Sequence, residues 1–393
     1  MKKPRVIFPF TEAGLGHIMP MNSVADEFER LYGDKVEVVR SDFFKETGDK
    51  KLIEYERLLS NYVVQYNKKP SFGFFATFNM DFWGTKISSW GAINVAGKGA
   101  FKKGVEHMTE LAPDLVFSTH WATNYYAAKM KTPPLTAMYC PDAKINTLFR
   151  YPCNLALSSM STGYERALKK HKRRFNKSNL KKVPFLIRKE AFDVSSDKKL
   201  LRRELGMRED LFTVFVADGG YGIGKMQKTC EELIERDLPI NLIAVCGKNE
   251  KAFSALKDKN SKGNTVIKVY GLTDDIFKLI AASDISCGKS GASLMAEPCF
   301  FGVPQLITHY ANDIERWIGK YYLNAVGSAI KEFNVKKACD LIEKFVAYPA
   351  LLQPYKRAAE NQRENYGANI CARYVFGLLC TRFPELKDGT ELY

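Results

Sequence analysis

The stretch 286–304 has residue types and spacing that suit a phosphate-binding turn. Its pattern predicts the end of a strand, a turn around Ser290 and Gly291, and a helix that ends at Gly302. Backbone N–H groups at the start of a helix lack helical partners, and the helix dipole adds positive potential, so the turn favours an anion. Glu297, about two turns further on, could reach a sugar hydroxyl pair of a nucleotide held there. An ordinary strand–turn–helix unit with a solvated glutamate fits the same residues.

A second glycine-rich run, residues 217–225, follows a predicted buried strand. Its glycines, Gly219, Gly220, Gly222 and Gly224, let the backbone approach a diphosphate or a sugar closely. Taken alone, the run also fits a flexible loop. Two such turns at the carboxyl ends of strands in one domain favour a nucleotide-sugar site.

The first elements of the chain predict the opening unit of a Rossmann-like domain. A short apolar strand, 6–10, leads into a turn that ends in Gly16 and His17, and residues 19–32 have helical spacing. Dinucleotide binding is disfavoured, because the turn lacks a third glycine and the next strand is not followed by an acid at the expected place. Glu12 in this turn is a carboxylate that could take a proton from an attacking alcohol, a role that contributes about 10²–10⁴ in rate.

Length and composition indicate a two-domain globular protein. The chain has 393 residues, 46% of them apolar and 26% charged. Nine scattered cysteines without a CxxC pair indicate reduced thiols, a cytoplasmic protein and no metal site, and we expect no secretory leader. No apolar run reaches the roughly 18 residues needed to span a bilayer.

Positive charge is concentrated in the first half of the chain, within a net charge of +15. The run 168–189 has ten lysines and arginines and no acid, and Lys170, Arg173 and Arg174 are its candidate contacts. Such a patch attracts anionic lipid head groups, and it attracts nucleic acid equally well. A solvated helix end without a partner also fits the run.

An aromatic segment, 68–84, lies between lysines in the same half. Aromatic rings beside basic residues are typical of membrane-interface segments, and Phe75 and Trp83 are the candidate contacts. The same rings also fit a buried core, so both interpretations stay open.

Three motifs give the chain a family resemblance. Lys289-Ser-Gly, followed by Ala-Glu at 296–297 and Gly-Val-Pro at 302–304, resembles the donor-nucleotide signature of glycosyltransferase family 28. The runs 217–225, 245–250 and 269–275 follow that family in the same order. The chain most resembles the galactolipid-synthase branch, next to processive diacylglycerol glycosyltransferases and the peptidoglycan enzyme that adds GlcNAc to a lipid carrier. The resemblance extends from Val6 to about Gly327.

The resemblance implies an α/β chain with the GT-B fold, in which two Rossmann-like domains face each other across a central cleft. An N-terminal acceptor and membrane-facing domain would cover 1–185, and a UDP-sugar-binding domain 186–350. Helices in 351–393, with a helical stretch from 351 to 379, would return toward the first domain. The residues 182–192 are expected to form a strand and linker between the domains. The implied activity is inverting transfer of a hexose from a UDP-sugar to diacylglycerol or a glycosyldiacylglycerol, with no cofactor and no essential metal.

The resemblance also assigns donor-binding residues. Glu297 would hold the ribose diol, backbone groups near Leu272 the uracil ring, and Asn312 with Asp313 the donor sugar. The implied donor-binding set is Gly219, Gly220, Tyr221, Gly222, Gly247, Leu272, Lys289, Ser290, Gly291, Ala292, Glu297, Asn312 and Asp313.

The same resemblance implies an acceptor site in the N-terminal domain. Glu12 would be the base, where the family has the shorter aspartate, and His17 would be a supporting contact. Asp142 is the second-choice base, and Gly16 and His120 would lie near the acceptor.

The expected partners are a UDP-sugar, a lipid acceptor and an anionic membrane surface, at the inner face of the cell membrane. Nucleic acid is not expected, because no recognised binding module is present and the aromatic cluster lies apart from the basic run. The alternatives are transfer to an isoprenoid-linked sugar, a non-catalytic membrane- or RNA-binding protein, and a sugar-nucleotide epimerase. The hexose, the exact lipid, processivity, the oligomeric state and the choice of base stay open.

Overall fold

A computed structural model describes residues 3–11, 15–97, 99–259 and 263–393. The chain forms two compact units. The first comprises Met1–Val63, Phe74–Arg188 and Asn365–Tyr393, and the second Val64–Gly73 and Lys189–Glu364.

The first unit is built on a six-stranded parallel sheet with the order β2-β1-β3-β4-β5-β6. Both faces of its central strands are buried: Val6 and Phe8 pack on one side, and Ile7 on the other. Burial on both faces explains why these strands are continuous apolar runs. The strands are β1 (Arg5–Phe10), β2 (Glu37–Asp42), β3 (Leu115–Ser118), β4 (Leu135–Cys140), β5 (Leu155–Ser158) and β6 (Leu180–Lys182).

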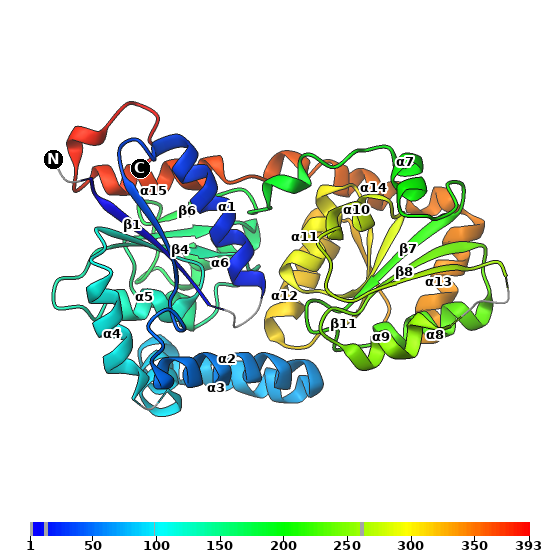
Figure 1. Cartoon of the computed structure of the whole chain (residues 1–393), viewed down its shortest axis with the longest axis horizontal. Helices are drawn as coiled ribbons and strands as arrows, with labels where there is room; N and C mark the ends of the chain where they lie inside the picture. The colour runs from blue at the N-terminus through cyan, green and yellow to red at the C-terminus, as the bar shows by residue number, and fades with distance from the viewer. Residues whose placement is uncertain (1–2, 12–14, 98, 260–262) are drawn as a thin grey trace. The chain divides into compact units, whose positions relative to one another are not determined.

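Helices cover both faces of this sheet. Helix α15, from the end of the chain, lies beside α1 (Figure 1), and the rings of Tyr32 and Phe376 stack with centroids 3.7 Å apart. The helices that lie wholly or mainly in this unit are α1 (Leu15–Tyr32), α2 (Lys50–Lys68), α3 (Pro70–Trp90), η1 (Gly91–Ala96), α4 (Ala100–Glu110), α5 (Trp121–Ala127), η2 (Leu148–Arg150), α6 (Ser161–Lys170), α15 (Asn369–Cys380) and η7 (Pro384–Leu386). The end of α2 and the start of α3, within Val64–Gly73, belong to the second unit.

The second unit has its own six-stranded parallel sheet, with the order β12-β11-β10-β7-β8-β9. Counted within the unit, this is the Rossmann order, which reverses direction between β7 and β10. The strands are β7 (Phe212–Ala217), β8 (Ile240–Val245), β9 (Val266–Tyr270), β10 (Ile285–Lys289), β11 (Gln305–His309) and β12 (Ala329–Lys331).

Residues that alternate along β7 face two separate cores, so this sheet is also covered on both sides. Val214 and Val216 pack against α8 and α13, and Phe215 packs against α10. The helices of the unit are η3 (Lys189–Ala191), α7 (Lys198–Glu204), α8 (Met226–Arg236), α9 (Glu250–Lys257), α10 (Ile276–Ala281), α11 (Ala292–Phe300), α12 (Asp313–Tyr321), η4 (Tyr322–Val326), α13 (Val335–Ala347), η5 (Pro349–Leu352), α14 (Gln353–Glu360) and η6 (Arg363–Asn365).

The connection between the units differs from the sequence expectation. A strand was expected at 182–192, but β6 ends at Lys182, and the only pairing described beyond it is an isolated bridge between Phe185 and Tyr366. The C-terminal segment that was expected to be helical from 351 to 379 is broken after α14. Helix α14 belongs to the second unit and α15 to the first.

Candidate functional site

The two glycine-rich turns lie at the point where the strand order of the second sheet reverses. The run 218–225 follows β7, and the turn around Ser290 follows β10, which is hydrogen-bonded to β7. In open α/β sheets, ligands bind outside the carboxyl ends of the strands at this switch point. The fold therefore brings together the two turns that the sequence singled out separately.

The first turn needs glycine at specific positions. Gly219 and Gly222 have φ values of 77° and 58°, which favour glycine, and the Gly222 N–H donates to the Gly219 carbonyl at 2.8 Å. A Cβ atom at Gly222 would lie 1.9 Å from the Cys246 carbonyl oxygen. Tyr221, half-buried at the tip, lies under the Lys248 ammonium, 5.8 Å from the ring centroid.

Gly247 lets the loop after β8 pack closely against this turn. Its φ is 57°, and a Cβ atom there would lie 2.4 Å from the Gly220 carbonyl oxygen. That carbonyl accepts the Lys248 N–H at 2.8 Å, and the Asn249 side-chain amide donates to the Gly222 carbonyl at 2.7 Å. Four of the five donor-binding glycines expected from the sequence, all but Gly291, therefore form one interlocked backbone surface.

Asp218 connects the two turns. Its side chain is almost fully buried, and its carboxylate accepts the Met226 N–H at 2.7 Å and the Lys289 N–H at 3.1 Å. The first of these bonds fixes the start of α8, and the second fixes the end of β10. One carboxylate thus holds both turns in place.

The second turn leads into the N-terminus of α11. Gly291 is the N-cap residue and Ala292 begins the helix, with no side-chain cap among the described residues. The Ser290 hydroxyl donates to the Glu315 carbonyl at 2.9 Å, which ties the second turn to α12. Glu297 and Leu294 are both half-buried on α11.

Two residues behind these turns were missed by the sequence analysis. Glu315 on α12 is buried and lies 3.0 Å from the Lys289 ammonium, with which it forms an ion pair. His309, at the end of β11, is buried with Nδ1 4.0 Å from Asp218, and its Nε2 has no hydrogen-bond partner among the described residues. Burial lowers the pKa of His309, against the opposing effect of Asp218 and Glu315. A lone His and a lone Glu carry no spacing signal in a sequence.

The other expected donor contacts have local partners. Asn312 is the N-cap of α12 and accepts the Glu315 N–H at 2.9 Å, while Asp313 forms an ion pair with Arg316. Leu272 is 58% exposed. Glu315, an acid of the same segment, is bonded to the second turn through Lys289.

In the first unit, His17 and His120 meet at the corresponding switch point, between β1 and β3. Their rings are 4.9 Å apart, edge to face. The Thr119 hydroxyl donates to the His17 carbonyl at 2.7 Å and ties the start of α1 to the end of β3. His120 is the N-cap of α5. Both histidines therefore lie where this sheet would bind a ligand.

The hydrogen bonds of these histidines define their tautomers. Nδ1 of His17 lies 2.8 Å from the Thr119 carbonyl oxygen, which only accepts, so Nδ1 carries the proton and Nε2 a lone pair. Nδ1 of His120 accepts the Ala122 N–H at 3.3 Å, which leaves its proton on Nε2. Burial lowers the pKa of both rings, well below the usual value for His120, so both are neutral at pH 7. The pair offers one acceptor and one donor.

Asp142 follows β4 at the same edge of the first sheet. Burial raises the pKa of its carboxyl to about 7, against the opposing hydrogen bond from Asn146. A carboxylate with this pKa is suited to general base work near neutral pH. Gly16 is the second residue of α1, whereas Glu12 lies outside the described residues.

Helix α3 exposes an aromatic face. Phe75, Phe78, Phe82 and Trp83 are between 57% and 72% exposed, and the first three have the helical spacing of a single face. Asp81 points elsewhere, because its carboxylate forms ion pairs with Lys144 at 2.7 Å and Arg150 at 2.6 Å. Phe75 and Trp83 are therefore surface residues, and the core interpretation is wrong for both.

The basic run separates into exposed and structural members. Lys170 and Arg173 are exposed. Arg174 instead donates to the carbonyls of Arg150 and Tyr151, both at 2.8 Å. These contacts make Arg174 a brace for the loop after η2.

No group of His, Cys, Asp and Glu side chains in the part of the chain that the structure describes is arranged to hold a metal ion. No helix of the described residues is both long and apolar enough to cross a membrane. All nine cysteines are free thiols.

Comparison with known proteins bears out the sequence resemblance. No family model matches the chain. The "Probable monogalactosyldiacylglycerol synthase 2, chloroplastic" of Oryza sativa subsp. japonica is 23% identical over 322 residues, which are 78% of this chain and 66% of that protein. The chain is similar to the monogalactosyldiacylglycerol synthases of glycosyltransferase family 28. It spans slightly less than two thirds of the length of this galactolipid synthase.

Solved structures establish the fold. MurG of Acinetobacter baumannii superposes with a TM-score of 0.55 at 12% identity, over 96% of this chain and 99% of that one. UDP-GlcNAc 2-epimerase of Neisseria meningitidis, bound to UDP-GlcNAc, gives 0.60 at 12% identity, over 96% and 100%. The chain has the GT-B fold of two Rossmann-like domains. At 12% identity, the likeness to MurG and to the epimerase shows the fold alone.

Proposed function

We propose that the protein is an inverting glycosyltransferase that moves a hexose from a UDP-sugar to the hydroxyl of a membrane lipid, diacylglycerol or a glycosyldiacylglycerol. The observation that carries this proposal is the pairing of the two glycine-rich turns at the Rossmann switch point, held together by Asp218. Similarity to galactolipid synthases supports the choice of a lipid acceptor.

The second unit would bind the donor. The N–H groups at the start of α11 and the backbone of the 219–222 turn would surround the diphosphate, and Glu297 would bind the ribose diol. As the bond between the anomeric carbon and the phosphate oxygen breaks, negative charge develops on UDP. The helix N-terminus and Lys289 are placed to stabilise that charge, so the proposed reaction needs no resident cofactor.

The first unit would bind the acceptor. The lipid hydroxyl loses its proton to a base as its oxygen forms a bond to the anomeric carbon from the side opposite UDP, which inverts the configuration. Asp142 is favoured as this base by its pKa of about 7, with Glu12 as the alternative, and the bare Nε2 of His17 would accept a hydrogen bond from the hydroxyl.

The exposed aromatic face of α3 would reach into the lipid interface, with Lys170 and Arg173 near anionic head groups. We propose a peripheral location on the inner face of the cell membrane on these grounds.

Turnover with a panel of UDP-glucose, UDP-galactose and UDP-GlcNAc and diacylglycerol vesicles tests the proposal. We expect a glycosylated lipid by mass spectrometry, released UDP, and an inverted anomeric centre by NMR. Glu297→Ala should reduce turnover at least tenfold, whereas Glu235→Ala, an exposed acid on α8, should not.

Three other results would each replace the proposal. Turnover of UDP-GlcNAc without any acceptor would indicate an epimerase. Product formed only with an isoprenoid-linked sugar would change the acceptor. RNA binding in a gel shift, with no UDP binding, would indicate a non-catalytic protein.

A further inference from the structure

The second unit has a pocket at the edge of its sheet opposite the glycine-rich turns. It lies at the amino ends of β7, β8 and β10, beside Phe212, Pro239 and Asp284, and has a volume of about 430 Å³. A strand of five or six residues is roughly 17–20 Å long, so this pocket is separate from the proposed donor site. The first helix of the unit, α7, and its last, α14, contribute to the wall.

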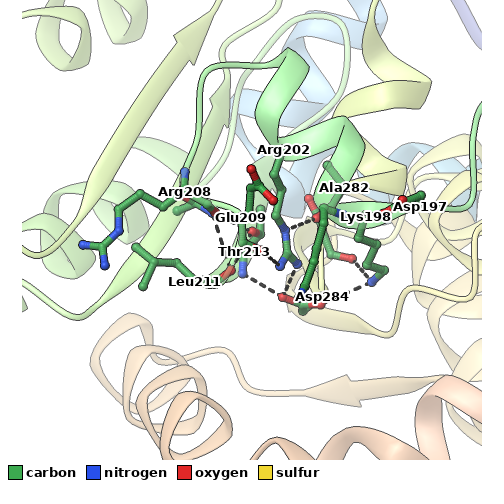
Figure 2. Close-up of polar contacts among 12 residues, drawn as sticks. Asp197, Lys198, Arg202, Arg208, Glu209, Leu211, Thr213, Ala282 and Asp284 are labelled. Carbon is green, nitrogen blue, oxygen red and sulfur yellow. Dashed lines mark hydrogen bonds and ion pairs between the residues drawn. The ribbon is translucent and has the colours of Figure 1, made fainter.

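The polar floor of the pocket is a neutral pair. Figure 2 shows the Arg202 guanidinium and the Lys198 ammonium both directed at Asp284. Arg202 uses every side of its guanidinium: it donates to the Ala282 and Glu209 carbonyls, both at 3.0 Å, and to Asp284 at 2.6 Å. Asp284 also accepts the Thr213 N–H at 2.8 Å (Figure 2). Arg202 thus balances the charge of Asp284, and both residues are part of the frame.

Two further cations line the pocket with little compensation. The Lys198 ammonium donates to the Ser283 carbonyl and lies 3.3 Å from Asp284, whose charge Arg202 already neutralises, and Lys356 is 4.0 Å from Glu360, whose side chain is half exposed. The remaining acid, Asp210, is at the rim, 75% exposed and 4.0 Å from Arg208. The pKa of Lys198 is lowered by burial and by Lys356, against the effect of Asp284. The pocket therefore has excess positive charge, which an anion would relieve.

Part of the pocket wall is apolar. It is made by Leu211 from the loop before β7, Phe212 of β7, Val346 of α13, and Pro349 and Leu352 of η5. A free inorganic ion would use only the lysines and leave this wall in contact with water. A ligand with an anionic head and an apolar body would use both surfaces.

We propose that this pocket binds an amphiphilic organic anion. Its carboxylate or phosphate head lies between Lys198 and Lys356, and its apolar body packs on Leu211, Val346 and Leu352. This binding would be independent of the proposed glycosyl transfer, because neither glycine-rich turn lines the pocket.

Calorimetry with four small probes tests the roles of head and body separately. Octanoate and octyl phosphate have both parts, inorganic phosphate has only the head, and octan-1-ol has only the body. We expect the two octyl anions to bind the full-length protein with at least tenfold higher affinity than phosphate or octanol. Comparison of the two anions shows which head is preferred. No saturable binding of either anion, or equal affinity for octyl phosphate and inorganic phosphate, would overturn the proposal.

Variants locate the binding. Lys198→Gln with Lys356→Gln should weaken octyl phosphate at least tenfold, and Val346→Trp should reduce its affinity to that of inorganic phosphate. Lys199→Gln, an exposed neighbour on α7 outside the pocket, should have no effect. If the double variant unfolds, Lys356→Gln alone, at a half-exposed side chain, tests the same loss of octyl phosphate affinity. Undiminished binding in folded lysine variants would overturn the proposal, and UDP binding in the same variants reports on the donor site separately.

Discussion

At the residue scale, the candidate site depends on a few side chains and glycines whose chemistry is set by their surroundings. Asp142 and the two buried histidines are all shifted toward their neutral forms by desolvation. Gly222 and Gly247 instead have no space for a side chain and φ values that disfavour one. Each of these facts leads to a measurable consequence.

The pH dependence of turnover identifies the base. If Asp142 is the base, kcat/KM should rise about tenfold per pH unit below pH 7 and level off above it, because the carboxyl must be ionised. Asp142→Asn should then lose roughly 10²–10⁴ in rate. An acid limb near pH 4 that survives in Asp142→Asn would instead point to Glu12.

Stability should show the opposite trend with pH. The folded-state pKa of Asp142, about 7, exceeds its unfolded value, so the folded state keeps a proton that the unfolded state has lost. The stability that the raised pKa of Asp142 gives the folded state is complete below about pH 4, and it is lost as the pH rises to about 7. Asp142→Asn should therefore reduce the fall in Tm between pH 4 and pH 8, as measured by circular dichroism. An unchanged fall would show that this carboxyl titrates normally.

Glycine substitutions should damage the donor turns. Gly222→Ala and Gly247→Ala should each lower the free energy of unfolding by about 1–3 kcal/mol and weaken UDP binding, because the new Cβ meets a carbonyl oxygen and φ is positive. Gly271→Ala, whose Cβ would lie 3.7 Å from the nearest atom, is the control. Denaturant titrations measure the difference. Equal effects at all three positions would contradict the close backbone packing.

At the scale of elements, the sequence predicted the strand–turn–helix units well. The predicted strand 6–10 and the helical residues 19–32 correspond to β1 and α1, because an apolar run is followed there by a glycine-containing turn and then by helical spacing. The sequence could not predict whether the aromatic segment is buried or exposed, because rings at helical spacing fit a core and a surface equally. Arg174 could not be told from Arg173 without the carbonyls that it contacts, nor could Glu315 be connected to Lys289.

The aromatic face of α3 predicts membrane binding. Phe78→Ser with Phe82→Ser should weaken binding to anionic vesicles by about tenfold or more, because two rings are lost from the lipid interface. Tm should change little, since both side chains are exposed. Flotation measures the bound fraction, and Tyr348→Ser, at a ring in the second unit that is similarly exposed, is the control. Equal flotation of the α3 variant and the Tyr348→Ser control would contradict a role for α3 in membrane binding.

At the scale of the whole molecule, each unit has its own sheet and its own cores. We therefore expect two unfolding transitions that respond to different changes. UDP should raise only the transition temperature of the second unit, because it binds the folded state of that unit. Phe376→Ala, which removes the stack with Tyr32, should lower the free energy of unfolding of the first unit by about 3–5 kcal/mol. Differential scanning calorimetry separates the two, and a UDP shift of the transition that Phe376→Ala affects would contradict this assignment.

The central claim is that the two turns joined by Asp218 bind the diphosphate of a uridine nucleotide. Isothermal titration of UDP into the full-length protein tests it most directly. We expect one UDP site per chain, with an affinity that is at least tenfold lower in Glu297→Gln and unchanged in Glu235→Gln. An absence of binding heat with the wild-type protein, or equal affinity in all three proteins, would contradict it.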